Sequence, residues 1–206
     1  MPHSTKYGLL AGISGLLIFG AACAKKPVAA TPPPPPHTMA MARTPAPAPN
    51  WGHAEKTAGC AVTGSLQDQG CTPGDIIKAN TKQVICSADF RTGDIRDSVT
   101  SPTEKAKVYD MYNIPHPTNN SGKNQKCEID HLVSLELGGN DTMANLWPQC
   151  SPGYAGWTGA GFRDKDKFEN YLHRQVCAGA VTLAEAQRQI ATDWYQYWIS
   201  AGKPKK

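Results

Sequence analysis

Apolar and polar residues alternate between Cys127 and Leu137, and this period of two predicts a β-strand with one buried face. The alternation stops at residues 138–141, a turn-forming Gly-Gly-Asn-Asp run. A second short strand is expected to start at Asn145 and to be closed by Pro148, which cannot donate to a strand ladder. We therefore expect the two strands to pair as a hairpin joined by a wide loop.

Helical periodicity is found before and after this hairpin. Residues 103–112 have a helix-forming composition with apolar side chains at helical spacing. Residues 164–177 place Phe168, Leu172 and Val176 on one face, which predicts an amphipathic helix. Together with the hairpin, these helices predict a domain of the α+β class.

Two further elements are expected. A final helix begins at the capping box Thr182-Leu-Ala-Glu185, after Gly179 has ended the preceding helix. Residues 83–86 are short, apolar and β-branched, and predict a strand. We interpret the apolar stripe of the final helix as core packing rather than as a base-stacking surface. The stripe consists of Leu183, Ala186, Ile190, Trp194 and Trp198.

The first 24 residues have the pattern of a signal peptide. Lys6 supplies a basic start, and residues 8–22 form an apolar run too short to span a bilayer comfortably. Ala22-Cys-Ala24 fits a cleavage pattern, which predicts an exported protein. The same residues resemble a bacterial lipobox, in which Cys23 would carry a lipid. Both a membrane-anchored lipoprotein and a periplasmic or secreted protein therefore remain open.

Residues 25–54 form a linker rich in Pro and Ala, which excludes a helix interior or a sheet. An extended, polyproline-like spacer is expected. It serves either as a tether between a membrane anchor and a working domain, or as a disordered leader with no role beyond its length. Residues 55–206 then form one domain, which is long enough for a single core.

The cysteines add a constraint on the fold and its location. The chain has seven, and six remain when Cys23 is set aside. None of them is spaced as Cys-x-x-Cys, which argues against a zinc ribbon or a thioredoxin motif. Behind an export signal they predict a disulfide-stapled domain in an oxidising compartment. We favour Cys60–Cys71, Cys127–Cys150 and Cys86–Cys177, because the second pair lies at the open ends of the hairpin, but other pairings remain open.

Candidate chemistry is concentrated at the hairpin. The net charge of +4 permits an anionic substrate without requiring one. Hydrolysis of a phosphodiester needs an activated water and neutralisation of developing charge. A histidine such as His131 can take the water's proton, and a hard carboxylate such as Asp130 suits a divalent metal that neutralises the charge. The amide of Asn145 can hold the intervening loop.

Two sequence runs resemble the HNH (His-Asn-His) endonucleases of the Asp-His type, and more narrowly their exported bacterial members. The runs are Glu128-Ile-Asp-His-Leu-Val-Ser-Leu-Glu-Leu-Gly-Gly and, from residue 145, Asn-Leu-Trp-Pro-Gln. The downstream run Lys165-Asp-Lys-Phe-Glu-Asn-Tyr-Leu matches as well, and the likeness covers residues 73–195. It implies a disulfide-stapled α+β domain with a small ββα-metal core, additional helices and endonuclease activity.

The resemblance also implies roles for individual residues. His131 is expected to be the general base, Asn145 to shape the loop at the catalytic centre, and Asp130 to bind the metal, expected to be Mg²⁺. The family places a third ligand, His or Asn, near the start of the downstream helix. This chain has no His there, and Asp164 is the expected replacement, with Asp166 also nearby.

Other interpretations of the same residues remain. His131 would also suit a buried structural position, and Asp130 a surface ion pair. The expected partner is nucleic acid, with DNA favoured over RNA, bound through its phosphates with low sequence specificity. Cys23 would supply a membrane tether. One alternative is a non-catalytic exported envelope or nucleic-acid-binding protein that retains the HNH fold. Another is a secreted, cysteine-stapled protein with an unrelated binding role.

Overall fold

The computed structural model describes residues 48–96 and 101–205. The chain divides into two units, Met1–Pro35 and Pro36–Lys206, and all described residues belong to the second. The expected signal peptide, with Cys23, and most of the expected linker lie outside the described residues. Gly52 N donates to Gly74 O at 2.8 Å, so the chain contacts the domain slightly before residue 55.

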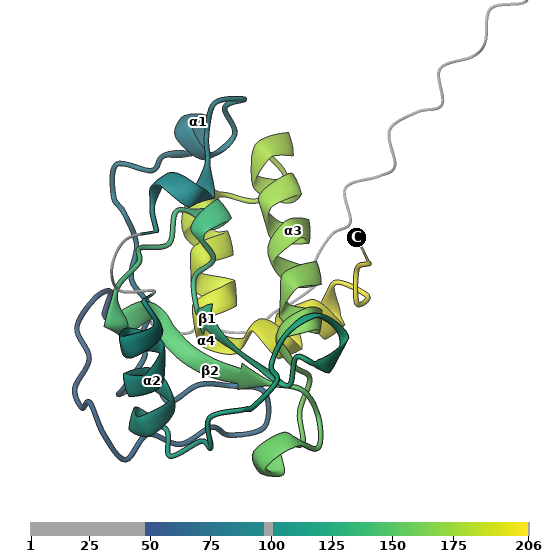
Figure 1. Cartoon of the computed structure of the whole chain (residues 1–206). Coiled ribbons are helices and arrows are strands. Elements are labelled where there is room, and N and C mark those ends of the chain that lie inside the picture. The colour runs from purple at the N-terminus through teal and green to yellow at the C-terminus, as the bar shows by residue number, and fades with distance from the viewer. Residues whose placement is uncertain (1–47, 97–100, 206) are drawn as a thin grey trace, which may run out of the picture. The chain divides into compact units, whose positions relative to one another are not determined.

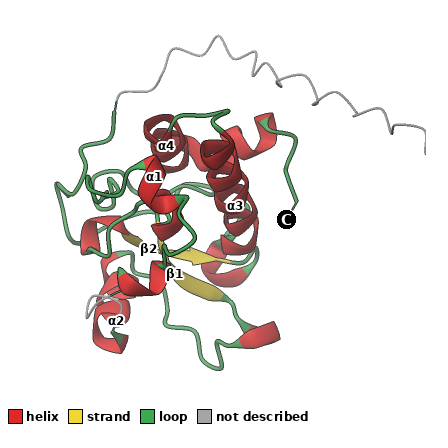
Figure 2. Ribbon diagram, turned by 90° about the horizontal axis from the view of Figure 1, so that it is seen from above, coloured by secondary structure: helices red, strands yellow, loops and turns green. Residues whose placement is uncertain are grey.

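The described chain combines helices with a small antiparallel sheet, which confirms the α+β class (Figures 1 and 2). The α-helices are α1 (Lys82–Ile85), α2 (Pro102–Met111), α3 (Phe162–Ala178) and α4 (Leu183–Ser200). The strands are β1 (Cys127–His131) and β2 (Leu146–Cys150). Short 3₁₀ turns are η1 (Thr92–Asp94), η3 (Gly122–Asn124), η4 (Leu135–Leu137), η5 (Met143–Asn145) and η6 (Tyr154–Gly156).

β1 and β2 form the expected hairpin, in a register that places Cys127 opposite Cys150. The prediction of strand as far as Leu137 is wrong, because β1 ends at His131 and η4 follows. The apolar residues beyond the strand are buried by the wide loop, which folds them into the core, and Val133 is fully buried. The alternation in the sequence has no counterpart in the burial, because residues 130–135 are all buried.

The strand predicted over residues 83–86 is likewise wrong, since this segment belongs to α1. The helix begins after Thr81, whose side chain accepts a hydrogen bond from Val84 N at 3.4 Å. Among the described residues, the named strands pair only with each other, so this segment has no sheet to join. A local capping bond thus outweighs the weak strand preference of four residues.

α3 and α4 lie side by side (Figure 1), α3 packs against β1, and both helices pack against η4 of the wide loop. Gly179 ends α3 in the left-handed conformation, at φ 79°, and Thr182 caps α4 by accepting from Glu185 N at 3.2 Å. These boundaries confirm the sequence prediction. The expected apolar faces are buried, and Trp194 of α4 also donates from its indole to Ser65 O at 2.8 Å. The interpretation of the stripe as core packing is therefore confirmed.

Disulfides connect the elements in the favoured pattern: Cys60–Cys71, Cys86–Cys177 and Cys127–Cys150. The first closes an N-terminal loop, the second joins the end of α1 to α3, and the third closes the open end of the hairpin. Three disulfides indicate an oxidising, non-cytoplasmic environment. No helix within the described ranges is long and apolar enough to cross a membrane.

Candidate active site

An acidic cavity of about 180 Å³ lies where β1 ends near α3. Asp130 and His131 enter it from β1, and Asp166 and Glu169 enter it from α3. The remaining lining residues are Thr92, Arg96, Glu128, Ser134, Leu135 and Glu136. Carboxylates therefore dominate the lining. The hairpin supplies three groups that can bind a cation or move a proton, and α3 supplies two.

Lys165 fixes the side of the cavity that Asp130 forms. Its side chain is fully buried, and its Nζ donates to Asp130 Oδ2 at 2.8 Å and to His131 O at 2.7 Å. A third bond joins it to Glu169 on the next turn of α3. Burial alone would lower the pKa of Lys165, but the two carboxylates outweigh it and raise the pKa, so the ammonium stays charged. Lys165 thus joins α3 to β1 and is not available to a substrate.

His131 is oriented by a carboxylate from the wide loop. Its Nε2 lies 2.7 Å from Asp141 Oδ1, and both side chains are buried. An ionised carboxylate only accepts, so Nε2 carries the ring proton and Nδ1 is the basic nitrogen. Burial lowers the pKa of His131, although Asp141 and Asp130 oppose the shift. The imidazole is consequently neutral at neutral pH and able to accept a proton.

Asn145 holds the wide loop behind the cavity. Its fully buried amide accepts from Val133 N at 2.9 Å and donates to Val133 O at 3.0 Å and Asn140 O at 2.7 Å. Gly139 allows the same close approach, because a Cβ there would lie 1.9 Å from Val133 O. Asn145 does not line the cavity, so it acts by positioning the loop that carries Asp141.

The expected third ligand, Asp164, is not brought to this cavity. Its Oδ1 lies 2.8 Å from Lys167 Nζ, and its side chain is 31% exposed. Asp166 lines the cavity instead. Positions two apart on an α-helix project roughly 200° from each other, so only one of the two acids can face β1. His173, further along α3, bonds to Ile85 O at 3.1 Å and also lies outside the cavity.

The acidic lining has an electrostatic cost that a cation would offset. Burial raises the pKa of Glu128, and the nearby Asp130 and Asp166 add to the shift. Burial also raises the pKa of Glu136, although His173, Lys165 and Arg174 oppose the shift. Burial, with Asp130 and Glu136 nearby, also raises the pKa of Glu169 above its usual range. Hard oxygen donors such as Asp130 and Asp166 are of the type that suits Mg²⁺ or a similar divalent ion. Among the described residues, however, the cavity's acids and His131 do not form a group of three whose ligand atoms all lie within 4.8 Å of one another, so the donors fit the expected metal in type only.

A basic depression adjoins the cavity. It is lined by Gly122, Lys123, Gln125 and Arg163, and Arg163 donates to Gly122 O at 3.3 Å. Gln125 Nε2 donates to Glu128 Oε2 at 3.2 Å, and Glu128 belongs to the acidic cavity. The two hollows therefore meet at the Gln125–Glu128 contact.

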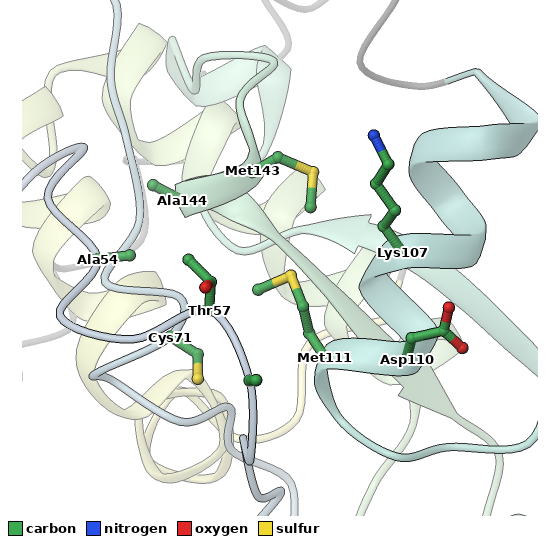
Figure 3. A pocket seen from close by; sticks show the side chains of 9 residues that line it. Ala54, Thr57, Cys71, Lys107, Asp110, Met111, Met143 and Ala144 are labelled. Atoms are coloured by element: carbon green, nitrogen blue, oxygen red, sulfur yellow. The ribbon is translucent and has the colours of Figure 1, made fainter.

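A larger pocket of about 420 Å³ lies elsewhere, between the N-terminal loop and α2 (Figure 3). Met111 of α2 and Met143, just before β2, project into it, while Lys107 and Asp110 lie on the α2 side. Its surface is mainly apolar, and its cysteine, Cys71, is held in a disulfide. It lacks the grouped acids and histidine of the smaller cavity, so the smaller cavity is the candidate site.

Sequence reasoning did not identify Asp141, which orients His131, and it favoured Asp164 over the nearby Asp166 that lines the cavity. Asp141 belongs to the turn-forming run after the first strand, and only the path of the loop brings it to His131. Asp166 lies in the run that resembles the HNH helix, but its orientation depends on how α3 packs.

Comparison with known proteins finds no matching family model, no matching curated protein and no matching solved structure.

Proposed function

We propose that the protein is an HNH-type, metal-dependent endonuclease that hydrolyses phosphodiester bonds of nucleic acid, with DNA as the expected substrate. The observation that carries the proposal is the shared cavity of Asp130, His131 and Asp166, in which Asp141 orients the histidine. The order of hairpin, wide loop and helix agrees with the arrangement that the sequence resemblance implies.

In this proposal, Nδ1 of His131 takes the proton of the attacking water, and Asp141 holds the ring and stabilises the imidazolium. Asp130 and Asp166 hold the divalent cation, which when bound neutralises charge on the phosphate. Lys165 keeps Asp130 in place, so that its other carboxylate oxygen is available to the ion.

The basic depression supports nucleic acid as the substrate. Lys123 and Arg163 are cations beside an acidic cavity, which suits a chain of phosphates with one phosphate at the metal and a neighbour on the basic side. Such contacts carry little sequence information, in agreement with low specificity. Three disulfides suit an enzyme that acts outside the cytoplasm.

The test is nicking of supercoiled plasmid by the purified full chain with Mg²⁺, with and without EDTA. His131→Ala is expected to lower the rate by about 10²- to 10⁴-fold, the usual contribution of a general base. His116→Ala, on an exposed histidine paired with Asp110, is the matched control and should cleave normally.

Three results would count against this proposal. Failure of the wild-type chain to cut either DNA or RNA with Mg²⁺ would exclude the enzyme. Equal cutting by His131→Ala would exclude the role given to His131. Salt-sensitive retention of DNA without cleavage would favour the non-catalytic binding protein instead.

A further inference from the structure

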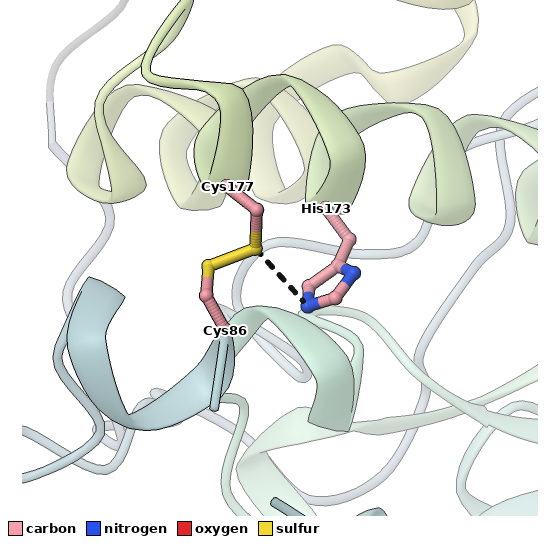
Figure 4. Close-up of side chains that lie close together, drawn as sticks. All are labelled: Cys86, His173 and Cys177. Atoms are coloured by element: carbon pink, nitrogen blue, oxygen red, sulfur yellow. Dashed lines mark hydrogen bonds between the residues drawn. A yellow bond between two sulfur atoms is a disulfide. The ribbon is translucent and has the colours of Figure 1, made fainter. Parts of the chain in front are cut away.

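Cys86, His173 and Cys177 gather where the end of α1 meets the C-terminal half of α3, and none of them lines the acidic cavity (Figure 4). Cys86 follows α1, while His173 and Cys177 lie one turn apart on α3. The cysteines form a disulfide, and His173 Nε2 lies 3.6 Å from Cys177 Sγ. The same Nε2 lies 3.1 Å from Ile85 O, and a carbonyl only accepts, so the ring N–H is shared between that carbonyl and one sulfur of a covalent link between two helices.

This disulfide is the accessible one among the described residues. Both of its cysteines are half-buried, whereas the four cysteines of the other two disulfides are buried. Thiol exchange requires that the attacking thiolate reach a sulfur, so exposure determines which disulfide reacts first. Cys86–Cys177 is consequently the first target of a small dithiol.

The position of His173 favours a particular direction of exchange. A thiolate of the dithiol attacks Sγ of Cys86, the Cys86–Cys177 bond breaks, and Cys177 leaves as a thiolate that accepts a hydrogen bond from His173. The second thiol of the reductant then displaces Cys86. The dithiol ends as a disulfide and two electrons pass to the protein, whose sulfurs become two thiols or thiolates.

The reduced side chains have the composition of a zinc site. One ligand atom from each of the three residues lies within 4.8 Å of the others. Two thiolates and an imidazole are a common zinc ligand set, and rotation of the cysteine side chains would bring the sulfurs to the roughly 3.8 Å separation of a tetrahedral site. In the disulfide the sulfurs are neutral and poor ligands, so binding requires reduction.

We propose that Cys86, His173 and Cys177 bind zinc, and that they can do so only after a dithiol has reduced the disulfide. Two thiolates and Nε2 of His173 bind Zn²⁺, and water takes the fourth position on the exposed side. His173 gives up its ring proton on this nitrogen and its bond to Ile85 O. The end of α1 stays attached to α3 in both states, first by a covalent bond and then by the ion.

The experiment uses the full chain, treated with limiting dithiol without oxygen and then freed of reductant. Alkylation and mass spectrometry should find Cys86 and Cys177 modified and the cysteines of the other two disulfides protected. Zinc titration against a chromophoric chelator should then give one additional equivalent per chain in the reduced protein over the oxidised protein. Co²⁺ in place of Zn²⁺ should give thiolate-to-cobalt charge-transfer absorption.

His173→Asn separates ligation from mere reduction. It should leave the pattern of alkylation unchanged and weaken zinc binding at least about tenfold. His116→Asn is the matched control and should bind zinc like the wild type. Cys86→Ser should abolish the additional equivalent, which distinguishes this site from the acidic cavity, whose carboxylates the change does not touch.

Several outcomes would overturn the proposal. They are earlier reduction of a buried disulfide, no additional zinc after reduction, and equal zinc affinity in His173→Asn. Reduction would also overturn the proposal if it abolished the far-ultraviolet circular dichroism of the chain and zinc did not restore it. None of these results bears on plasmid cleavage, so this proposal and the nuclease proposal fail separately.

Discussion

At the scale of single residues, Lys165 shows how a buried charge is made tolerable. Its ammonium group is bound by two carboxylates and a backbone carbonyl, all from β1 or α3. A buried pair adds little net stability when complete, because desolvation cancels much of the attraction. Removing one partner is different, since the remaining charges stay buried without compensation.

Lys165→Met is therefore expected to lower the free energy of unfolding by about 3 to 5 kcal/mol, because Asp130 and Glu169 lose their cation. Urea unfolding measures the change. Lys167→Met is the control, since Lys167 makes an exposed pair with Asp164 that contributes less than about 1 kcal/mol. Equal losses in the two variants would show that Lys165 is not the electrostatic link between helix and strand.

Two acids on α3 give a second comparison at this scale. Asp166→Asn should raise the Mg²⁺ concentration needed for half-maximal nicking by at least about tenfold, because a cavity carboxylate is lost. Asp164→Asn should leave it unchanged, since Asp164 binds Lys167 outside the cavity. A magnesium titration of plasmid nicking measures both. If Asp164→Asn raised the Mg²⁺ requirement and Asp166→Asn did not, Asp164 would be the third ligand.

At the scale of elements, the wide loop between β1 and β2 depends on one amide. Asn145 satisfies the N–H and the carbonyl of Val133 and the carbonyl of Asn140. Buried backbone groups that lose their partners cost more than the bonds themselves contribute. Asp75 holds the later part of the loop by accepting from Asn140 Nδ2 and Thr142 Oγ1, both at 2.9 Å, so Asn145 chiefly governs the part around Val133.

Asn145→Ala should destabilise the domain by about 3 kcal/mol through these orphaned groups. It should also speed hydrogen exchange at the Val133 amide, because that N–H loses its acceptor. Asn124→Ala, at an exposed position of η3, should change neither quantity. Unchanged exchange at Val133 in Asn145→Ala would mean that other contacts hold the loop.

The elements also show which predictions sequence can support. α3 and α4 were predicted because their stop at Gly179, cap at Thr182 and apolar faces are all local signals. α1 was mistaken for a strand, since four apolar and β-branched residues fit either state until a capping bond and a disulfide decide. The path of the loop that delivers Asp141 depends on tertiary contacts, which no local pattern encodes.

At the scale of the whole molecule, a net charge of +4 coexists with an acidic cavity. The basic depression beside that cavity carries Lys123 and Arg163. Binding of a polyanion should therefore depend on this local arrangement more than on net charge. Each cation that contacts a phosphate also makes binding more sensitive to salt.

Arg163→Ala should weaken DNA binding in EDTA and lower the slope of log affinity against log salt by about 1, the value for one lost phosphate contact. Fluorescence anisotropy at several salt concentrations gives the slope. Lys107→Ala, on α2 beside the apolar pocket, is the control and should keep the wild-type slope. A similar fall in both variants would indicate that only the overall charge matters.

The disulfide Cys127–Cys150 closes the hairpin at the end opposite to Asp130 and His131. A one-residue shift in a strand turns every side chain to the other face, so it would remove Asp130 from Lys165. The disulfide therefore fixes the register of β1 against β2. Insertions between Cys127 and Asp130 should be intolerable during divergence. The Gly-containing stretch after Cys150, where residues 151–156 are all exposed or half-buried, should tolerate changes of length.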